Sequence, residues 1–579
     1  PDALLAVLRS IKNYYGINIT LVFGCGGERD KKKRPLMAKI ANKNCQKIYI
    51  TDDNPRKEKP EKIRAELLKH ILKNKTFNIG KRELAIKKAI QNAEPGEIIL
   101  VAGKGHEDKQ IIMKINFKHK IKYSKNQNYL QNNLILKEII NKPKNFKFNG
   151  LSTDTRTIKK ENLFLAIKGK YHDGNKYINI ALKKGAGCVA TDYNVKKSKK
   201  IIKIKNTILF LNSFAKLKRK YTQANIIAIT GSAGKTSLKN LIKDLLKYFG
   251  KTHFSPRSFN NHLGVPISLS NLSYEDKFGV FEVGMSNSGE IRNLTSLIKP
   301  KIGIITNIGE AHIENFKNIN GIAKAKSEMI ENIKVGGTII LNRDDKFFNY
   351  LYKKAKKYKL NVTTFGRHKK SDVRLEKIIN QKNNSKVIIK IRKQKINFEI
   401  RDINIYNVLA SLAVLKELKI DFLKVLTKFK NFNSPEGRGK KYTILRYKKK
   451  FKFIDESYNA NPLSVKNAIK KLSLIKKEKF KKYLILGDML ELGSKSKKFH
   501  EELSRVINNS DIDKLFIKGK KTLFTYKHIN KDKRGNIFQN IEDIDLSLSK
   551  IISNNDYLMI KGSNNTGLNN FSKKMIKGI

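Results

Sequence analysis

Short runs of apolar and β-branched residues recur along the chain, and several end at a glycine that precedes a segment with helical spacing. The clearest case is residues 225–240 (NIIAITGSAGKTSLKN), where an apolar run breaks at Gly231 and a helical stretch begins after Gly234. Strands that alternate with helices in this way predict α/β domains with mostly parallel sheets. In such domains ligands bind at the carboxyl ends of the strands.

The same pattern divides the chain into segments. Strands and helices alternate through residues 1–122, whereas 115–148 are rich in lysine and asparagine, with one short helical patch at 134–140. Few contacts are expected to cross such a polar stretch, so it predicts a domain boundary. We expect an α/β domain at 1–122, a linker at 123–148, a small α/β domain at 149–222, a central nucleotide-binding domain at 223–435 and a Rossmann-like domain at 436–579.

The first and last segments share landmarks. In both, a proline-led helix precedes a strand that runs into a glycine turn, at Gly24 and at Gly487. A second strand and glycine follow 79 residues after Gly24, at Gly103, and 75 residues after Gly487, at Gly562. This spacing predicts two copies of one domain type. Since the chain begins with Pro1 rather than methionine, we expect a fragment or processed product of two concatenated enzymes.

The turn after residues 226–230 has the composition of a phosphate-binding loop. Backbone N–H groups and a helix N-terminus face the anion, a lysine neutralises it, and a hydroxyl reaches a magnesium ion. The loop is short, Gly-x-x-Gly-Lys-Thr, and a chance glycine turn is the alternative. We expect the loop to hold ATP through Gly231, Ser232, Ala233, Gly234, Lys235, Thr236 and Ser237.

Two later strands end in polar side chains that could serve this loop. Glu282 lies at the end of an apolar run, and a hard oxygen ligand near Thr236 suits the magnesium bound to ATP. His312 follows an apolar run at 302–305 that is expected in the same sheet. A lone histidine is usually structural, so spacing alone leaves His312 open between a second metal ligand and a structural role.

Charge and cysteine content narrow the function only slightly. The formal net charge of +72 invites a nucleic-acid partner, but the lysines are spread along the whole chain and no RNA-binding signature occurs. Three cysteines without a CxxC pair indicate neither structural zinc nor a disulfide framework. No apolar run reaches the length of a membrane span, and no signal peptide is seen. We therefore expect a cytoplasmic monomer with no nucleic-acid partner and no membrane span.

A set of motifs occurs together in the second part of the chain. They are 231–236 (GSAGKT), 258–266 (SFNNHLGVP), 281–285 (FEVGM), 306–312 (TNIGEAH), 325–328 (AKSE), 437–439 (GRG), 454–462 (IDESYNANP), 486–493 (LGDMLELG) and 561–563 (KGS). With 152–156 and 171–174 they strongly resemble the Mur ligases, and within that family the MurF branch. The resemblance covers about residues 130–579.

The resemblance implies the Mur ligase architecture and an amide-forming reaction of peptidoglycan precursor synthesis. Such enzymes use ATP to phosphorylate a carboxylate, and an amine then attacks the acyl phosphate; ATP and two Mg²⁺ ions are the implied cofactors. The MurF branch implies UDP-N-acetylmuramoyl-tripeptide and D-alanyl-D-alanine as substrates. A nucleic-acid-dependent P-loop ATPase is the rival from another class, although Glu282 stands without the Asp-Glu pair of helicases.

The resemblance also assigns roles to single residues. Lys235 would bind the β- and γ-phosphates, Thr236 and Glu282 the first magnesium, and His312 the second. Lys326 matches a lysine that is carbamylated in many family members, although the sequence alone favours a surface lysine. The implied catalytic residues are Lys235, Lys326, His312 and Arg438.

Further nucleotide and substrate contacts follow from the same resemblance. Arg438 would reach the γ-phosphate, Asp455 the ribose and Asn407 the adenine region. The implied substrate-binding residues are Ser152, Asp154, Arg156, Asp173, Asn260, Asn261, Tyr458, Asn459 and Asn461.

Residues 1–122 resemble a different branch, the C-terminal domain of MurE. Its matching stretches are 23–30 (FGCGGERD), 51–56 (TDDNPR) and 102–107 (AGKGHE), and the Asp-Asn-Pro-Arg motif implies meso-diaminopimelate. Arginines could pair with the distal carboxylate of that ligand. The implied binding residues are Arg29, Asp53, Asn54, Arg56, Gly103 and Glu107. Alternatives are a tethered structural module, or a second, diaminopimelate-adding activity if the natural gene extends upstream.

Overall fold

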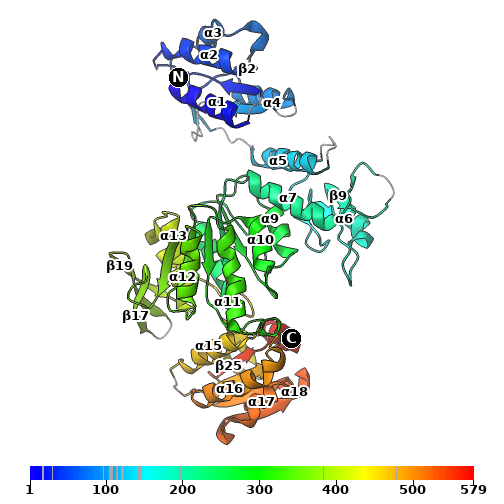
Figure 1. The fold of residues 1–579 in the computed structure, drawn as a ribbon, viewed down its shortest axis with the longest axis vertical. Helices are drawn as coiled ribbons and strands as arrows, with labels where there is room; N and C mark the ends of the chain where they lie inside the picture. The colour runs from blue at the N-terminus through cyan, green and yellow to red at the C-terminus, as the bar shows by residue number, and fades with distance from the viewer. Residues whose placement is uncertain are drawn as a thin grey trace. The chain divides into compact units, whose positions relative to one another are not determined.

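The computed structural model describes residues 1–15, 18–28, 30–94, 97–102, 109–112, 115–118, 123–140, 146–195, 198–381, 384–476 and 479–578. Two compact units, Pro1–Tyr123 and Ser124–Ile579, divide the chain. The first unit is the dark-blue part of Figure 1. Within the described ranges, no helix is both long enough and apolar enough to cross a membrane.

The first unit is a parallel sheet covered by helices on both faces. Its strand order is β3-β2-β1-β4, and each neighbouring pair is parallel. Core residues of α1 and α2 pack on one face, whereas Ala85, Ile86 and Ala89 of α4 pack on the other. The elements are α1 (Asp2–Tyr15), β1 (Ile19–Phe23), α2 (Lys33–Asn44), β2 (Lys47–Ile50), α3 (Pro60–Leu68), β3 (Thr76–Asn78), α4 (Arg82–Gln91) and β4 (Ile98–Val101).

The second unit begins with a small α/β domain. Its parallel sheet has the order β10-β9-β8-β7, as expected from the pattern at 149–222. The elements are α5 (Tyr123–Ile140), β7 (Leu151–Ser152), β8 (Leu163–Leu165), α6 (Ile178–Lys183), β9 (Cys188–Thr191), β10 (Ile201–Lys203) and α7 (Thr207–Tyr221).

Helix α5 corrects the predicted linker at 123–148. Ile135 and Leu136 are fully buried in the core of the small domain, together with Phe148. The Asn132 amide donates a hydrogen bond of 3.1 Å to the Phe148 carbonyl. The helix is therefore part of the folded domain. The asparagines and lysines of α5 obscured its full length in the sequence, which showed only the helical patch at 134–140.

The central domain is built on one long sheet with the order β12-β13-β11-β14-β15-β16-β17-β18-β19. The pairs from β12 to β17 are parallel, and β17, β18 and β19 extend the sheet as antiparallel strands, which the sequence pattern did not predict. The strands are β11 (Asn225–Thr230), β12 (Thr252–Phe254), β13 (Phe278–Glu282), β14 (Ile302–Ile305), β15 (Thr338–Asn342), β16 (Asn361–Gly366), β17 (Val373–Asn380), β18 (Ser385–Ile391) and β19 (Gln394–Ile400).

Helices cover both faces of this sheet, as the green ribbons of Figure 1 show. Leu238, Leu241 and Leu245 of α8 share a core with α13, and the opposite core includes residues of α10, α11 and α12. The helices are α8 (Lys235–Leu246), α9 (Gly264–Ser270), α10 (Glu290–Ile298), α11 (Ile319–Ser327), α12 (Phe348–Lys357), α13 (Ile405–Glu417) and α14 (Leu426–Lys430). Strand β11 lies between β13 and β14, so the three segments that follow these strands meet at one edge.

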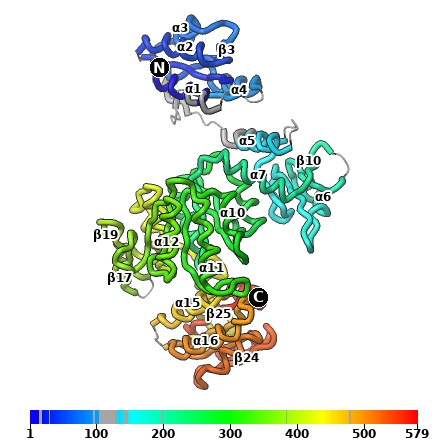
Figure 2. Tube along the Cα trace, viewed as in Figure 1, coloured from blue at the N-terminus to red at the C-terminus, as the bar shows by residue number. Residues whose placement is uncertain are grey.

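The last domain, yellow to red in Figure 2, has a sheet of order β20-β21-β25-β22-β23-β24. Only the β20–β21 pair is antiparallel. The elements are β20 (Lys440–Arg446), β21 (Lys449–Glu456), α15 (Pro462–Ser473), β22 (Lys482–Gly487), α16 (Ser496–Asn508), β23 (Lys514–Lys518), α17 (Thr522–Lys527), β24 (Arg534–Phe538), α18 (Ile541–Ile551), β25 (Tyr557–Lys561) and α19 (Leu568–Lys577).

The order β24-β23-β22-β25 repeats the order β3-β2-β1-β4 of the first unit. In both copies a helix precedes the equivalent strand, which is β1 in the first unit and β22 in the last domain. Each strand leads into the glycine that marked the repeat in the sequence, Gly24 or Gly487. Gly24 and Gly487 therefore occupy equivalent positions in two copies of one fold.

The place of α5 in the core is tested by two leucines on the same helix. Leu136 is 1% exposed and Leu134 is 57% exposed. We expect Leu136→Ala to lower the free energy of unfolding of the second unit by about 2–5 kcal/mol, because it leaves a cavity. Leu134→Ala should change it by about 0.5 kcal/mol or less. Chemical denaturation of both variants measures the difference; equal, small effects would mean that α5 is a linker after all.

Candidate active site

The phosphate-binding loop predicted at 231–236 lies between β11 and α8. Gly231 has φ +145° and Gly234 has φ +83°, conformations that favour glycine. A Cβ atom on Gly231 would lie 1.9 Å from Thr306 Oγ1, so a side chain cannot fit there. A Cβ atom on Gly234 would lie 3.2 Å from Asn407 Oδ1, which puts Asn407 beside the loop.

The segment after β14 fixes the shape of this loop. Thr306 Oγ1 donates to the Ala233 carbonyl (2.8 Å), and the Ala233 N–H donates to Asn307 Oδ1 (2.9 Å). The Ser232 hydroxyl donates to the Gly309 carbonyl and accepts from the Gly309 N–H, both at 2.8 Å. These bonds within the chain fix the backbone conformation of the loop.

Lys235 is the first residue of α8 and points back over the loop. Its ammonium donates to the Gly231 carbonyl at 2.7 Å. Burial lowers the pKa of Lys235; Glu282 opposes this shift and Arg438 adds to it, so both charges act at the Lys235 ammonium. The structure thus brings Lys235, Glu282 and Arg438 together, although Arg438 comes from the last domain.

Two buried oxygen atoms near the loop fit a hard cation. Thr236 Oγ1 and Glu282 Oε2 are both buried, and neither has a hydrogen-bond partner among the described residues. Glu282 Oε1 accepts from the Asn260 amide at 2.9 Å, and Oε2 lies 3.7 Å from the Lys239 ammonium. Hydroxyl and carboxylate oxygens are ligands that Mg²⁺ accepts. In the described ranges no three His, Cys, Asp or Glu side chains form a ready metal cluster.

Lys326 lies at the end of α11 and is 2% exposed, so the surface interpretation of this lysine is wrong. Burial, and then the charge of Lys235, hold the pKa of Lys326 well below its usual range. A lowered pKa favours the neutral amine, which is the form that can act as a nucleophile. Carbamylation of Lys326 stays a prediction.

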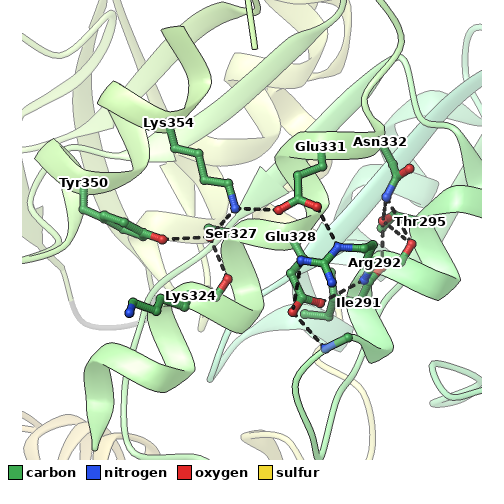
Figure 3. A network of polar contacts seen from close by, with 11 residues as sticks. Ile291, Arg292, Thr295, Lys324, Ser327, Glu328, Glu331, Asn332, Tyr350 and Lys354 are labelled. Atoms are coloured by element: carbon green, nitrogen blue, oxygen red, sulfur yellow. Dashed lines mark hydrogen bonds and ion pairs between the residues drawn. The ribbon is translucent and has the colours of Figure 1, made fainter. Parts of the chain in front are cut away.

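A network of polar contacts fixes the turn that follows Lys326 (Figure 3). Glu328 accepts hydrogen bonds from the N–H groups of Gly289 (2.8 Å) and Arg292 (3.0 Å) at the start of α10. Glu331 contacts the Arg292 guanidinium and the Lys354 ammonium, both at 2.7 Å. These contacts connect the start of α10, which follows Glu282 in the chain, with the turn that follows Lys326.

His312 follows β14 in a left-handed conformation, with φ +58°. Its Nδ1 atom lies 2.7 Å from Glu491 Oε2 of the last domain. Its role as a metal ligand stays a prediction. Sequence reasoning did not find Glu491, which is far from His312 along the chain.

The last domain touches the loop directly. The Asn461 amide donates to the Ser232 carbonyl at 3.2 Å, and the Tyr458 hydroxyl donates to Ser258 Oγ at 3.3 Å. The Arg438 guanidinium stacks on the Tyr458 ring, 4.5 Å from its centroid. These contacts bring Tyr458, and with it Arg438, against the central domain; their roles at the γ-phosphate and the substrate stay predictions.

Several predicted binding residues make structural hydrogen bonds instead of pointing at an open site. Asp455 is 1% exposed and accepts from the Gly437 N–H (2.8 Å) and the Ser457 hydroxyl (2.6 Å). Asn461 caps α15, with its oxygen 2.8 Å from the Ser464 N–H, and the Asn261 oxygen accepts from the Gly264 N–H at the start of α9 at 2.9 Å. The ribose role of Asp455 stays a prediction, but its present partners would have to be shared. Asn459 bonds to the next backbone N–H at 2.9 Å.

In the small domain, Asp154 and Arg156 form a paired charge on the surface. The guanidinium contacts both carboxylate oxygens at 2.8–3.1 Å and, as the main cause, lowers the pKa of Asp154. Asp173 accepts from the Asn175 N–H at 2.9 Å and so starts a short 3₁₀ helix. Ser152 is mostly buried and bonds to the backbone of Asp154. Substrate contacts at these residues stay predictions.

In the first unit, Arg56 donates to the Gly27 carbonyl, and the Gly27 N–H donates to the Asn54 carbonyl at 2.8 Å. The loops that carry Asn54 and Gly27 are therefore joined, and Asp53 belongs to the same turn. A buried arginine that the sequence did not single out, Arg34, braces them through Glu58 at 2.8 Å. The predicted residues Arg29, Gly103 and Glu107 lie outside the described residues.

Lys239 is a second residue that sequence reasoning missed. It is 1% exposed and donates to the Arg257 carbonyl while lying beside Glu282. The available signal was its spacing: four residues after Lys235, it lies on the same face of α8.

A short glycine loop at the end of a central parallel strand, with buried lysines and a carboxylate beside it, defines a P-loop nucleotide-binding enzyme of the α/β class. Family models agree: the Mur ligase middle domain matches residues 229–415, and the Mur ligase glutamate ligase domain matches both 1–105 and 442–564. The chain belongs to the Mur ligase family. The two matches to one domain model confirm the predicted internal repeat.

Relatives and solved structures agree with this membership. A UDP-N-acetylmuramoyl-tripeptide–D-alanyl-D-alanine ligase from Buchnera aphidicola subsp. Acyrthosiphon pisum is 32% identical over 74% of this chain and 93% of its own length. The protein of the same name from Bacillus subtilis is 29% identical over the same shares. A crystal structure of MurF from Acinetobacter baumannii has a TM-score of 0.68 at 23% identity, covering 77% of this chain and 98% of that one.

A MurF structure from Thermotoga maritima in complex with ADP has a TM-score of 0.64 at 23% identity, over 74% of this chain and 97% of that chain. These two structures show the shared fold. The specific assignment of 1–122 to the MurE branch stays a prediction, because the matching family model describes the domain type alone.

The network in Figure 3 can be tested with two glutamates one turn apart. Glu328→Ala removes the acceptor of two backbone N–H groups, and we expect a loss of about 1–3 kcal/mol in the free energy of unfolding. Glu331→Ala breaks ion pairs nearer the solvent and should cost about 1 kcal/mol or less. Denaturant titration of both variants measures the order, and a larger loss for Glu331→Ala would contradict it.

Proposed function

We propose that this chain is an ATP-dependent ligase that joins D-alanyl-D-alanine to UDP-N-acetylmuramoyl-tripeptide. The observation that carries the proposal is the similarity to ligases of that name over 93% of their length at 32% and 29% identity. The geometry supports it, because a glycine-rich loop of the phosphate-binding type lies beside cations from two domains, Lys235 and Arg438. A cytoplasmic location and a monomeric state stay predictions.

The residues of the loop have roles that follow from their positions. Lys235 now bonds to the Gly231 carbonyl, and a phosphate oxygen would take over that bond. Arg438 is held by Tyr458 within electrostatic reach of Lys235, so it can balance charge on the transferred phosphoryl group. Asn407 lies against Gly234, and in this proposal it contacts the adenine region of the nucleotide.

Magnesium would bind Thr236 Oγ1 and Glu282 Oε2, two buried oxygens without a hydrogen-bond partner among the described residues, of which Oε2 has the Lys239 ammonium 3.7 Å away. When bound, the metal would neutralise the charge that builds up between nucleotide and carboxylate substrate. Lys326, once carbamylated, would present a carboxylate in place of an ammonium and join this set, with His312 as a further ligand. Two metal ions remain our expectation.

The reaction then proceeds in two transfers. A carboxylate oxygen of the tripeptide attacks the γ-phosphorus and ADP leaves; the amine nitrogen of D-alanyl-D-alanine attacks the acyl carbon, phosphate leaves and the amine loses a proton. Lys235 and Arg438 stabilise the charge of the first transfer. Contacts of Asn461 and Tyr458 with the central domain keep the site closed to water during both steps.

A coupled assay tests the proposal. The purified chain should release ADP only when UDP-N-acetylmuramoyl-tripeptide and D-alanyl-D-alanine are both present, and mass spectrometry should find the pentapeptide product. We expect Lys235→Met to lower kcat at least about 100-fold, since it removes a charge that stabilises the transition state. Lys247→Met, at the exposed end of α8, is the matched control and should change kcat less than about twofold. ADP release stimulated by DNA or RNA instead would refute the proposal.

The first unit supports a second, narrower statement. Residues 1–123 contain no Gly-x-x-Gly-Lys-Thr loop, and the phosphate loop at 231–236 is the one such loop in the sequence. A ligase domain without a phosphate loop cannot activate a carboxylate. We therefore propose that the first unit is a binding or structural module that catalyses no ligation of its own.

The prediction is that the 579-residue chain forms no product from UDP-N-acetylmuramoyl-dipeptide, meso-diaminopimelate and ATP. Mass spectrometry of the reaction measures this, with the D-alanyl-D-alanine reaction of the same preparation as the control. Detection of the tripeptide product would contradict this prediction and would show that the central domain works with the first unit as well as with the last domain.

A further inference from the structure

A short loop of the last domain, residues 488–495, is held rigidly by its own domain. Asp488 Oδ1 accepts from two backbone N–H groups at the start of α17, at 3.0 and 2.8 Å. The Met489 N–H donates to the buried His500 ring at 3.1 Å, and the Leu490 N–H donates to Ser563 Oγ at 3.1 Å. The next residue, Glu491, is therefore presented on a fixed support.

The tip of this loop contacts the segment that follows β14 in the central domain. The Glu314 N–H donates to the Glu491 carbonyl at 3.3 Å, and the Lys495 ammonium donates to the Lys317 carbonyl at 2.7 Å. Gly493 has φ +54°, and a Cβ atom there would lie 2.9 Å from Glu314 Cβ. The absence of a side chain at Gly493 thus permits the close approach of the two domains.

At the centre of this contact Glu491 meets His312. Glu491 Oε2 lies 2.7 Å from His312 Nδ1. Glu491 has φ +61° and His312 has φ +58°, a conformation that is uncommon for residues other than glycine. Backbone strain of this kind persists where the surroundings impose it, and it concentrates at functional sites.

Stability alone is a weak explanation for the pair. The His312 side chain is 25% exposed and the Glu491 side chain 50%, and ion pairs at such exposure contribute little to folding. By contrast, a carboxylate on one ring nitrogen of a histidine fixes the orientation of the ring and leaves the other nitrogen as the metal-binding atom. Occupation of Nδ1 leaves Nε2 for that purpose.

We propose that Glu491 is a positioning residue for His312: its carboxylate, in contact with Nδ1, orients the imidazole so that Nε2 can bind a divalent cation of the nucleotide site. Because Glu491 belongs to the last domain, docking of that domain and completion of the metal site become one event. The proposal rests on the proposed function in one respect, that His312 serves as a metal ligand.

Direct metal binding tests the proposal without turnover. Mn²⁺ is titrated into the full chain by electron paramagnetic resonance in the presence of a non-hydrolysable ATP analogue. We expect Glu491→Gln to weaken Mn²⁺ binding at the second site by about 10-fold or more. Glu314→Gln is the matched control, since it removes an exposed carboxylate from the same contact and should change the affinity less than about twofold.

A double variant separates positioning from a purely structural role. If Glu491 acts through the imidazole, Glu491→Gln added to His312→Asn should change Mn²⁺ affinity no further. Additive losses, an unchanged affinity in Glu491→Gln, or a wild-type chain that binds a single Mn²⁺ per analogue would each overturn the proposal. In the coupled assay, Glu491→Gln should lower kcat while leaving KM for D-alanyl-D-alanine within about twofold.

The two proposals fail in different ways. Mn²⁺ titration needs neither the peptide substrate nor product formation. Loss of affinity in Glu491→Gln would therefore support the positioning role even if the wild-type chain made no pentapeptide, which would refute the proposed ligase activity alone.

Discussion

Burial of positive charge around the phosphate loop is the constraint on which the rest of this structure depends. Lys239 and Lys326 are almost fully buried and Lys235 is partly buried, and Glu282 is the carboxylate that acts on Lys235 and Lys239. Buried ammonium groups are costly unless anions compensate them. Arg438, which the last domain contributes, adds a further cation beside the loop that Thr306 helps to fix. A polyanion bound at the loop would compensate the positive charge gathered there.

The sequence predicted those parts of the fold and site whose signals are local. A strand that ends in glycine and precedes a helix predicts its own loop, so residues 231–236, Glu282 and the repeat at Gly24 and Gly487 could be found from the pattern alone. The full length of helix α5 and the antiparallel strands β17–β19 could not be predicted. The part of α5 before residue 134 is mostly asparagine, glutamine and lysine, and the three strands alternate in a way that does not reveal the direction of pairing.

Residues that act across domain contacts were the least predictable. Glu491 and His312 meet because two loops, each with an unusual backbone conformation, are brought together by packing that no sequence period records. Asp455, Asn461 and Asn261 show the reverse problem. Their polar side chains resemble ligand contacts in a motif, yet hydrogen bonds within the chain already occupy them, because a turn or helix start needs the same acceptor oxygens.

The contact between Lys239 and Glu282 has a consequence for how the enzyme is assembled. With its ammonium 3.7 Å from Glu282 Oε2, Lys239 supplies the carboxylate with a covalently attached counter-ion. The buried carboxylate is thus neutralised while the chain folds. If Glu282 binds the magnesium of a nucleotide, as we propose, the metal ion would have to displace the Lys239 ammonium rather than enter a site without a cation.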